Sequence, residues 1–222
     1  MRLEVLADAE AVAAAAAERL AAHARAGHHI ALSGGSTPAR AHELAAGLLD
    51  DWRGAVLWFG DDRAVPPDHE HSNHAMAKAT LLDRIAADRR PRVERILGER
   101  GAESAAADYE ARRRGAPPLD LALMGLGPDA HTASLFPGQP AMHERERHAV
   151  AVPEAGMEPH VPRVTLTLPV FEAAGEVVFL VAGAAKREAV RRAFGPAPDP
   201  ASPAAHLRGD NVLVLCDPEA AP

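Results

Sequence analysis

The stretch His29-Ile30-Ala31-Leu32-Ser33-Gly34-Gly35-Ser36-Thr37-Pro38 contains the pattern that decides the fold. Its short apolar run predicts a buried strand, and two glycines separate that strand from a second helical pattern. On the N-terminal side, the Ala-rich residues from Asp8 to Ala26 predict a helix, with Asp8 as N-cap and Gly27 as its stop. The unit is therefore helix, strand, glycine turn and helix.

The same order of elements recurs along the chain. Apolar runs at residues 56–59, 119–124 and 177–181 each lead into a segment that contains glycine, and a helical pattern through residues 186–194 follows the last of them. Continuous apolar strands that alternate with helices favour a parallel sheet covered on both faces. We therefore expect an α/β fold with a mainly parallel sheet, in a single domain that spans residues 1–222.

The composition excludes several classes of protein. The chain has 222 residues, 47% of them hydrophobic and 25% charged, and no apolar run approaches the roughly 20 residues that cross a bilayer. A net charge of −7 with no Lys/Arg-rich block argues against a nucleic-acid partner. The N-terminus lacks the pattern of a secretion signal, and the single cysteine, Cys216, lies in an apolar run that predicts a buried strand. We expect a cytoplasmic protein without a membrane segment.

Polar clusters follow the predicted strands at the sheet edge where open α/β sheets bind ligands. In the segment Ser33 to Pro38, free backbone N–H groups and the positive end of a helix dipole are suited to a phosphate. A strand-to-helix turn with a Ser/Thr cap is the structural alternative. The segment alone does not decide between them.

Two further clusters differ in how they are interpreted. Asp61, Asp62 and Arg63 follow a buried strand, which places their charged groups at the ligand-facing edge of the sheet. In a functional site, Arg63 would face developing negative charge and an Asp would hold it in place. The alternative is a solvated Asp-Arg pair on a loop. Residues 68–74 are dense in potential metal ligands, but their spacing matches no zinc signature. We predict no metal site and no cofactor.

The segment from Gly125 to Pro137 is the most informative. It brings Asp129 and His131 to the same sheet edge, where a neutral imidazole can accept a proton near pH 7, although a capping or core histidine is the alternative. Arg163 and Lys186 each place one cation near that edge. Singly such side chains are usually solvated, but together they could clamp an anion.

These segments resemble, in the same order, those of the 6-phosphogluconolactonase family, whose superfamily also contains glucosamine-6-phosphate deaminases and ribose-5-phosphate isomerases. The resemblance spans nearly the whole chain and comprises residues 32–38, 58–66, 72–73, 125–137, 163–167 and 183–186. It implies a Rossmann-like fold of the deaminase/isomerase type. It also implies hydrolysis of 6-phospho-D-glucono-1,5-lactone to 6-phosphogluconate in the oxidative pentose phosphate pathway, with a phosphorylated sugar lactone as the small-molecule partner.

The resemblance also implies roles for individual residues. His131 would be the general base that activates water, and Arg63 would lie near the reacting carbonyl. Apart from the resemblance, we expect Asp129 to orient the imidazole. The resemblance also implies that the substrate's 6-phosphate is held by Gly34, Gly35, Ser36, Thr37, Arg163 and Lys186, and we further predict Asp61 as a substrate-binding residue. We expect a monomer or a small homo-oligomer.

The sequence departs from the family pattern at two positions. The family usually has Asp-Glu-Arg where this chain has Asp62 in the middle of the triplet, and Asp-Gly-His where this chain has Ala130. A shorter acid at position 62 is tolerable if it only orients neighbours. Ala130 removes backbone freedom beside the proposed base.

Two other functions stay open. A deaminase or aldose-ketose isomerase on the same fold would need an extra acid/base; deaminases resemble His-Ile-Ala-Phe-Asn-Glu-Pro where this chain has His-Thr-Ala-Ser-Leu-Phe-Pro over residues 131–137. A sugar-phosphate sensor would bind without chemistry. The chain has no Gly-x-Ser-x-Gly elbow and no usable cysteine nucleophile, so water is the expected nucleophile.

Overall fold

Seven parallel strands form the central sheet of the computed structural model, which describes residues 1–222. Every pair of neighbouring strands runs parallel, and the predicted apolar runs all lie within this sheet. The mainly parallel sheet expected from the sequence is thus confirmed. In spatial order the strands are β1 (Arg2–Val5), β10 (Val212–Cys216), β9 (Glu176–Val181), β6 (Leu121–Met124), β2 (His29–Leu32), β3 (Val56–Phe59) and β5 (Arg92–Val93).

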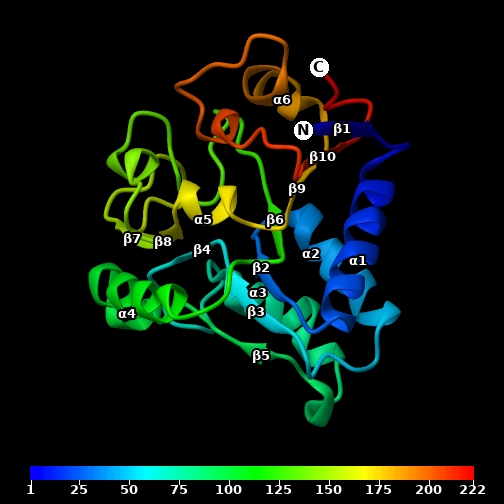
Figure 1. Cartoon of the computed structure of the whole chain (residues 1–222), viewed down its shortest axis with the longest axis vertical. Coiled ribbons are helices and arrows are strands. Elements are labelled where there is room, and N and C mark those ends of the chain that lie inside the picture. Colours follow the sequence, from blue (N-terminus) through cyan, green and yellow to red (C-terminus); the bar gives the residue numbers. More distant parts are fainter.

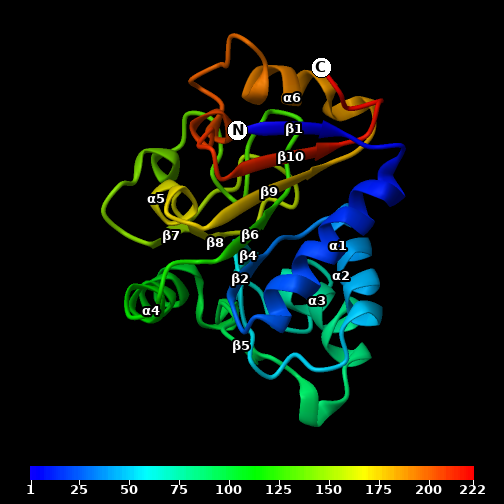
Figure 2. The ribbon, with the colours of Figure 1, turned by 45° about the vertical axis from the view of Figure 1, so that its right-hand side comes forward.

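Helices cover the sheet from two sides. Figure 2 shows α1, α2 and α3 on one side of the ladder of parallel strands and α4 and α5 on the other. The helices are α1 (Ala9–Arg25), α2 (Ser36–Leu48), α3 (Asn73–Thr80), α4 (Ala102–Arg114), α5 (Leu168–Glu172) and α6 (Arg187–Phe194). Short 3-10 helices span Leu82–Arg84, Ala87–Arg89, Gly98–Arg100, Pro140–His143, Ala184–Lys186 and Pro203–His206. No helix combines the length and the apolar character that a membrane crossing requires.

The predicted limits of the first helix are confirmed. The side chain of Asp8 accepts a hydrogen bond from the backbone N–H of Ala11 at 2.8 Å, which satisfies a free donor of the first turn. Gly27 follows the last turn with a φ of +76°, a conformation that glycine adopts without steric cost. The Ala-rich face between these ends is buried, so α1 lies close to the sheet and to α2.

A second, antiparallel sheet of three strands was not predicted. It contains β4 (Asp61–Arg63), β8 (Arg163–Leu166) and β7 (Ala149–Val152), and α4 packs against it (Figure 1). Gly60 connects the two sheets, because its N–H donates to Leu32 of β2 and its carbonyl accepts from Leu166 of β8. Residues 61–63 are therefore a strand rather than a loop, and Asp61 and Asp62 are buried.

A buried histidine in α2 predicts acid sensitivity. His42 is fully buried, and burial, which disfavours the charged form, lowers its pKa from 6.5 to about 4. Because the pKa of His42 is lower in the folded state than in the unfolded state, the protein keeps the stability that depends on neutral His42 above pH 6.5. It loses this contribution to the free energy of unfolding as the pH falls towards 4. The loss between pH 7 and pH 4 is about 3 kcal/mol. Urea unfolding at both pH values should show a smaller difference for His42→Leu than for the wild type; equal differences would contradict the assignment to His42.

Candidate active site

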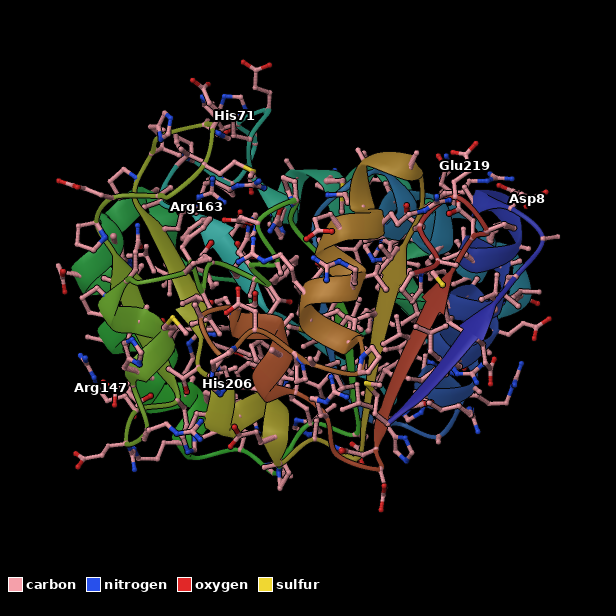
Figure 3. All side chains as sticks on the ribbon, turned by 90° about the horizontal axis from the view of Figure 1, so that it is seen from above. Asp8, His71, Arg147, Arg163, His206 and Glu219 are labelled. Atoms are coloured by element: carbon pink, nitrogen blue, oxygen red, sulfur yellow. The ribbon has the colours of Figure 1, made fainter.

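The carboxyl ends of β2, β6 and β9 open into a cavity of about 260 Å³. The second sheet closes it from the other side, since β4 and β8 contribute Asp61, Arg63 and Arg163 to its lining. In Figure 3, Arg163 lies towards the same side of the molecule as His71, whereas Arg147 and His206 lie on the other. Every predicted site residue except Asp129 lines this cavity, namely Gly34, Gly35, Ser36, Thr37, Asp61, Arg63, His131, Arg163 and Lys186.

The glycine turn leads into the N-terminus of α2. Gly35 is the N-cap residue with a φ of +112°, which other residues rarely adopt, and no side chain caps the first turn. The first N–H groups of a helix have no partner within the helix, and the helix dipole makes this end positive. Ser36 and Thr37 begin the helix at the cavity wall, so this end of the cavity is suited to an anion.

Arg163 extends from β8 and is only 3% exposed. Its Nη2 donates to the carbonyls of Met157 and Pro159 at 2.8 and 3.2 Å, while its Nε is buried without a partner. Burial lowers the pKa of Arg163, the charge of Asp61 opposes that change, and Arg63 adds to it. A buried cation with a free donor is costly unless an anion satisfies it.

Lys186 lies on the 3-10 turn that precedes α6. Its Nζ donates to the carbonyl of Leu126 at 2.7 Å, which directs the ammonium towards the β6 loop. Burial lowers the pKa of Lys186, and the charge of Asp129 opposes this. The two cations predicted to form an anion clamp thus line one cavity, from separate elements.

The side chain of Arg63 is held by Asn73. We had expected an aspartate in this place. The Nη1 of Arg63 donates to the side-chain oxygen of Asn73 at 2.5 Å and to the carbonyl of His71 at 3.3 Å, and its Nε is buried without a partner. Asn73 begins α3, is buried and lines the cavity. Sequence reasoning did not select it as a site residue, although residues 72–73 formed one of the segments of family resemblance.

Asp62 anchors the start of α3. Its carboxylate accepts from the backbone N–H groups of Arg63, Asn73 and His74 and from the hydroxyl of Ser72. Burial raises the pKa of Asp62, and the three backbone N–H groups oppose this. Asp62 does not line the cavity, so the shorter acid at this position acts on neighbouring backbone groups.

Asp129 and His131 are in direct contact. The Nδ1 of His131 lies 2.5 Å from the Oδ1 of Asp129, and the backbone N–H of His131 donates to the same oxygen at 3.1 Å. An ionised carboxylate can only accept, so Nδ1 carries the proton and Nε2 keeps a free lone pair. Partial burial raises the pKa of Asp129, but the hydrogen bonds and charge of His131 outweigh it and hold that pKa below its usual value.

The backbone around His131 is tightly constrained. Ala130 is fully buried with a φ of +64°, a left-handed conformation that costs an L-residue about 1–2 kcal/mol. The backbone at position 130 thus has a left-handed conformation that glycine would adopt freely, although the residue here is alanine. Gly127 faces the imidazole so closely that an added Cβ would lie 2.0 Å from the Nδ1 of His131. The ring of Phe136 packs on His131 at 4.7 Å between centroids.

The histidine-rich segment at residues 68–74 serves local structure. His69 accepts from the backbone N–H of His71, and His74 contacts the carbonyl of Pro67. Nowhere in the chain do three or more His, Cys, Asp or Glu side chains form a group that could hold a metal ion.

Known proteins resemble this chain in sequence and in structure. A model of the family described as glucosamine-6-phosphate isomerases/6-phosphogluconolactonase matches residues 5–215. A 6-phosphogluconolactonase from Nostoc is 38% identical over 77% of this chain and 72% of the relative, and one from Mycobacterium leprae is 36% identical over 99% and 96%. The solved structure of a 6-phosphogluconolactonase from Trypanosoma brucei superposes with a TM-score of 0.85 at 29% identity, over 99% of this chain and 97% of that one.

The sequence relatives are 36–38% identical to this chain, a similarity that goes beyond a shared fold. The family model covers nearly the whole chain, and the relative from Mycobacterium leprae aligns with 99% of it. The chain belongs to the glucosamine-6-phosphate isomerase/6-phosphogluconolactonase family.

Proposed function

We propose that this chain hydrolyses 6-phospho-D-glucono-1,5-lactone to 6-phosphogluconate, in the oxidative pentose phosphate pathway, and that the cavity is its active site. The observation that carries the proposal is the pairing, in one cavity, of an Asp-oriented histidine with two arginines, half-buried Arg63 and buried Arg163, whose buried Nε atoms have no partner in the protein. Such a cavity supplies a base for water and donors for two separate negative charges, a phosphate and a developing oxyanion.

The reaction would proceed in two steps. The Nε2 of His131 takes a proton from water as the water oxygen attacks C1, and the carbonyl oxygen becomes an oxyanion that Arg63 stabilises. Asp129 stabilises the imidazolium that forms. The tetrahedral intermediate then breaks its bond to the ring oxygen, which receives the proton from His131 and leaves as the C5 hydroxyl. No group of the protein changes covalently.

The phosphate would lie at the other end of the cavity. The N-terminus of α2, Arg163 and Lys186 would bind it, and this remote binding holds C1 against His131 and Arg63.

The deaminase alternative is disfavoured by Phe136. In the resembling deaminase motif the acidic partner of the histidine stands at the position of Phe136, whose ring here packs on His131. The imidazole therefore has one carboxylate partner, Asp129, which suits hydrolysis better than the proton shuttling of an isomerisation.

The direct test follows the disappearance of freshly generated 6-phosphogluconolactone, corrected for spontaneous hydrolysis. Turnover by the wild type supports the proposal. Ammonia release from glucosamine 6-phosphate without lactone turnover would support the deaminase instead. A thermal shift with sugar phosphates and no turnover of either substrate would support the sensor.

Removing the charge of Lys186 should weaken binding rather than chemistry. A hydrogen bond to a charged group is worth about 1.5–3 kcal/mol, so Lys186→Met should raise KM for the phosphorylated lactone by roughly 10- to 100-fold. The variant should leave the hydrolysis of unphosphorylated glucono-1,5-lactone unchanged. Lys78→Met, at the only other lysine of the chain, is the matched control. Equal losses on both lactones would contradict a phosphate contact.

We further propose that residues 1–222 act as one domain in the cytoplasm, as a monomer or small homo-oligomer without a nucleic-acid partner. One cluster of 57 buried hydrophobic residues extends through both sheets, and the single cysteine is free and buried. Size-exclusion chromatography with light scattering tests the oligomeric state.

A further inference from the structure

A buried carboxylate on β4, the strand that carries the proposed oxyanion contact Arg63, contacts the loop that carries the proposed base. Asp61 is 5% exposed, and both of its carboxylate oxygens accept hydrogen bonds from the protein. The hydroxyl of Ser134 donates to one oxygen at 2.6 Å, and the side-chain nitrogen of Asn73 donates to the other at 3.2 Å. Asp61 thereby joins segments that are 61 residues apart in sequence.

The contact to Ser134 holds the loop of His131. Ser134 stands three residues after His131 and is fully buried, and its backbone N–H donates to the hydroxyl of Thr165 in β8. The loop is thus tied to both β4 and β8 of the second sheet, and a shift of Asp61 would move the segment on which the imidazole stands.

The contact to Asn73 sets the orientation of an amide. The side-chain nitrogen of Asn73 donates to the carboxylate and to the backbone carbonyl of Asp61, so the amide oxygen is left to accept from Arg63. The amide occupies the space beside Gly34 that a side chain there would fill, because a Cβ on Gly34 would lie 2.1 Å from the amide oxygen. Asp61 therefore acts on the guanidinium of Arg63 through Asn73.

The charge of Asp61 is unsuited to a direct contact with an anionic substrate. The phosphate of the proposed substrate and the carboxylate of its product are both negative, and a carboxylate repels them. The same charge favours the protonated form of buried Arg163. The sequence suggested that Asp61 binds substrate, whereas its oxygens face protein donors.

We propose that Asp61 is a positioning residue that fixes His131 relative to Arg63, with Ser134 and Asn73 as its two contacts. The inference rests on the proposed lactonase function and deepens it. The general base and the oxyanion donor must face the same carbon atom, and a misplacement of about 1 Å can cost 10²-fold in rate. A single rigid junction at Asp61 between β4, the His131 loop and the start of α3 meets this requirement.

The test compares Ser134→Ala, Asn73→Ala and the double variant in the lactone assay. We expect each single variant to lower kcat by roughly 10- to 100-fold with little change in KM. The double variant should lose less than the product of the two single losses, since each substitution breaks the same connection. Ser202→Ala, at another fully buried serine outside the cavity, is the control and should keep the kcat of the wild type.

The variant Asn73→Asp tests whether Asn73 acts through its hydrogen bond with Asp61 or only through its contact with Arg63. An aspartate keeps an oxygen for Arg63 but loses the donor that bonds Asp61, and it places two carboxylates against each other. If Asn73 acts through Asp61, Asn73→Asp loses as much kcat as Asn73→Ala. Retained activity in Asn73→Asp, multiplicative losses in the double variant, or losses in KM alone would overturn the inference. An inactive wild type would remove the proposed function and, with it, this inference.

Discussion

Replacing His131 by alanine is expected to lower kcat for 6-phosphogluconolactone by about 10²- to 10⁴-fold. The imidazole is the only group in the cavity that combines a free nitrogen lone pair with a fixed orientation, because Asp129 binds its Nδ1 at 2.5 Å. KM should change little, since the proposed phosphate contacts lie on other elements. The measurement is lactone disappearance under saturating substrate, corrected for spontaneous hydrolysis.

Asp129→Asn sharpens this prediction. An asparagine that donates to Nδ1 would favour the tautomer with its proton on Nε2, which cannot act as a base. We therefore expect Asp129→Asn to lose most of the rate that His131→Ala loses, and the double variant to lose no more than His131→Ala. Full activity in His131→Ala would keep the reaction but assign the base to another residue.

The sequence predicted the five inner strands of the central sheet because β2, β3, β6, β9 and β10 consist mostly of apolar residues, whereas the edge strand β1 alternates charged and apolar residues. Asp8 and Gly27 delimit α1 as expected, and the glycine turn at Gly34 and Gly35 leads from β2 into α2. Such signals are local, since they depend on backbone conformation and burial within a few residues. The positions of the polar clusters followed from the rule that parallel strands share a carboxyl edge.

The second sheet had no comparable signal. The strand β4 has three residues, all of them charged, and it pairs with a partner about 100 residues later in the chain. Its stability comes from tertiary contacts, such as those of Asp62 with the start of α3, which no local pattern reveals. For the same reason the sequence placed an aspartate against Arg63, where the structure has Asn73.

In the candidate site too, the sequence predicted one part and missed another. Family resemblance selected the residues that line the cavity, but not the hydrogen bonds that hold them. Ser134 and Asn73 carry no charge, and a serine or asparagine in a loop is usually solvated or capping. Their importance depends on being buried against Asp61, which becomes visible only when three distant segments are placed together.

Gly127→Ala should inactivate the proposed base although His131 itself is not substituted. A Cβ at this position would lie 2.0 Å from Nδ1 and 2.1 Å from Cε1 of His131, so the imidazole must rotate away. Rotation breaks the contact with Asp129 and moves Nε2 from the attacking water. The expected loss in kcat approaches that of His131→Ala, about 10²- to 10⁴-fold.

The control for this prediction is the His131→Ala background, in which the added methyl group meets no ring. There, Gly127→Ala should cause no further loss of kcat, and a thermal melt should show that both variants are folded. A multiplicative loss in the double variant would mean that Gly127 acts on substrate or on the backbone rather than on His131. Non-additivity, together with a retained fold, assigns the whole effect to one side chain, because residues that act as a unit lose their joint contribution only once.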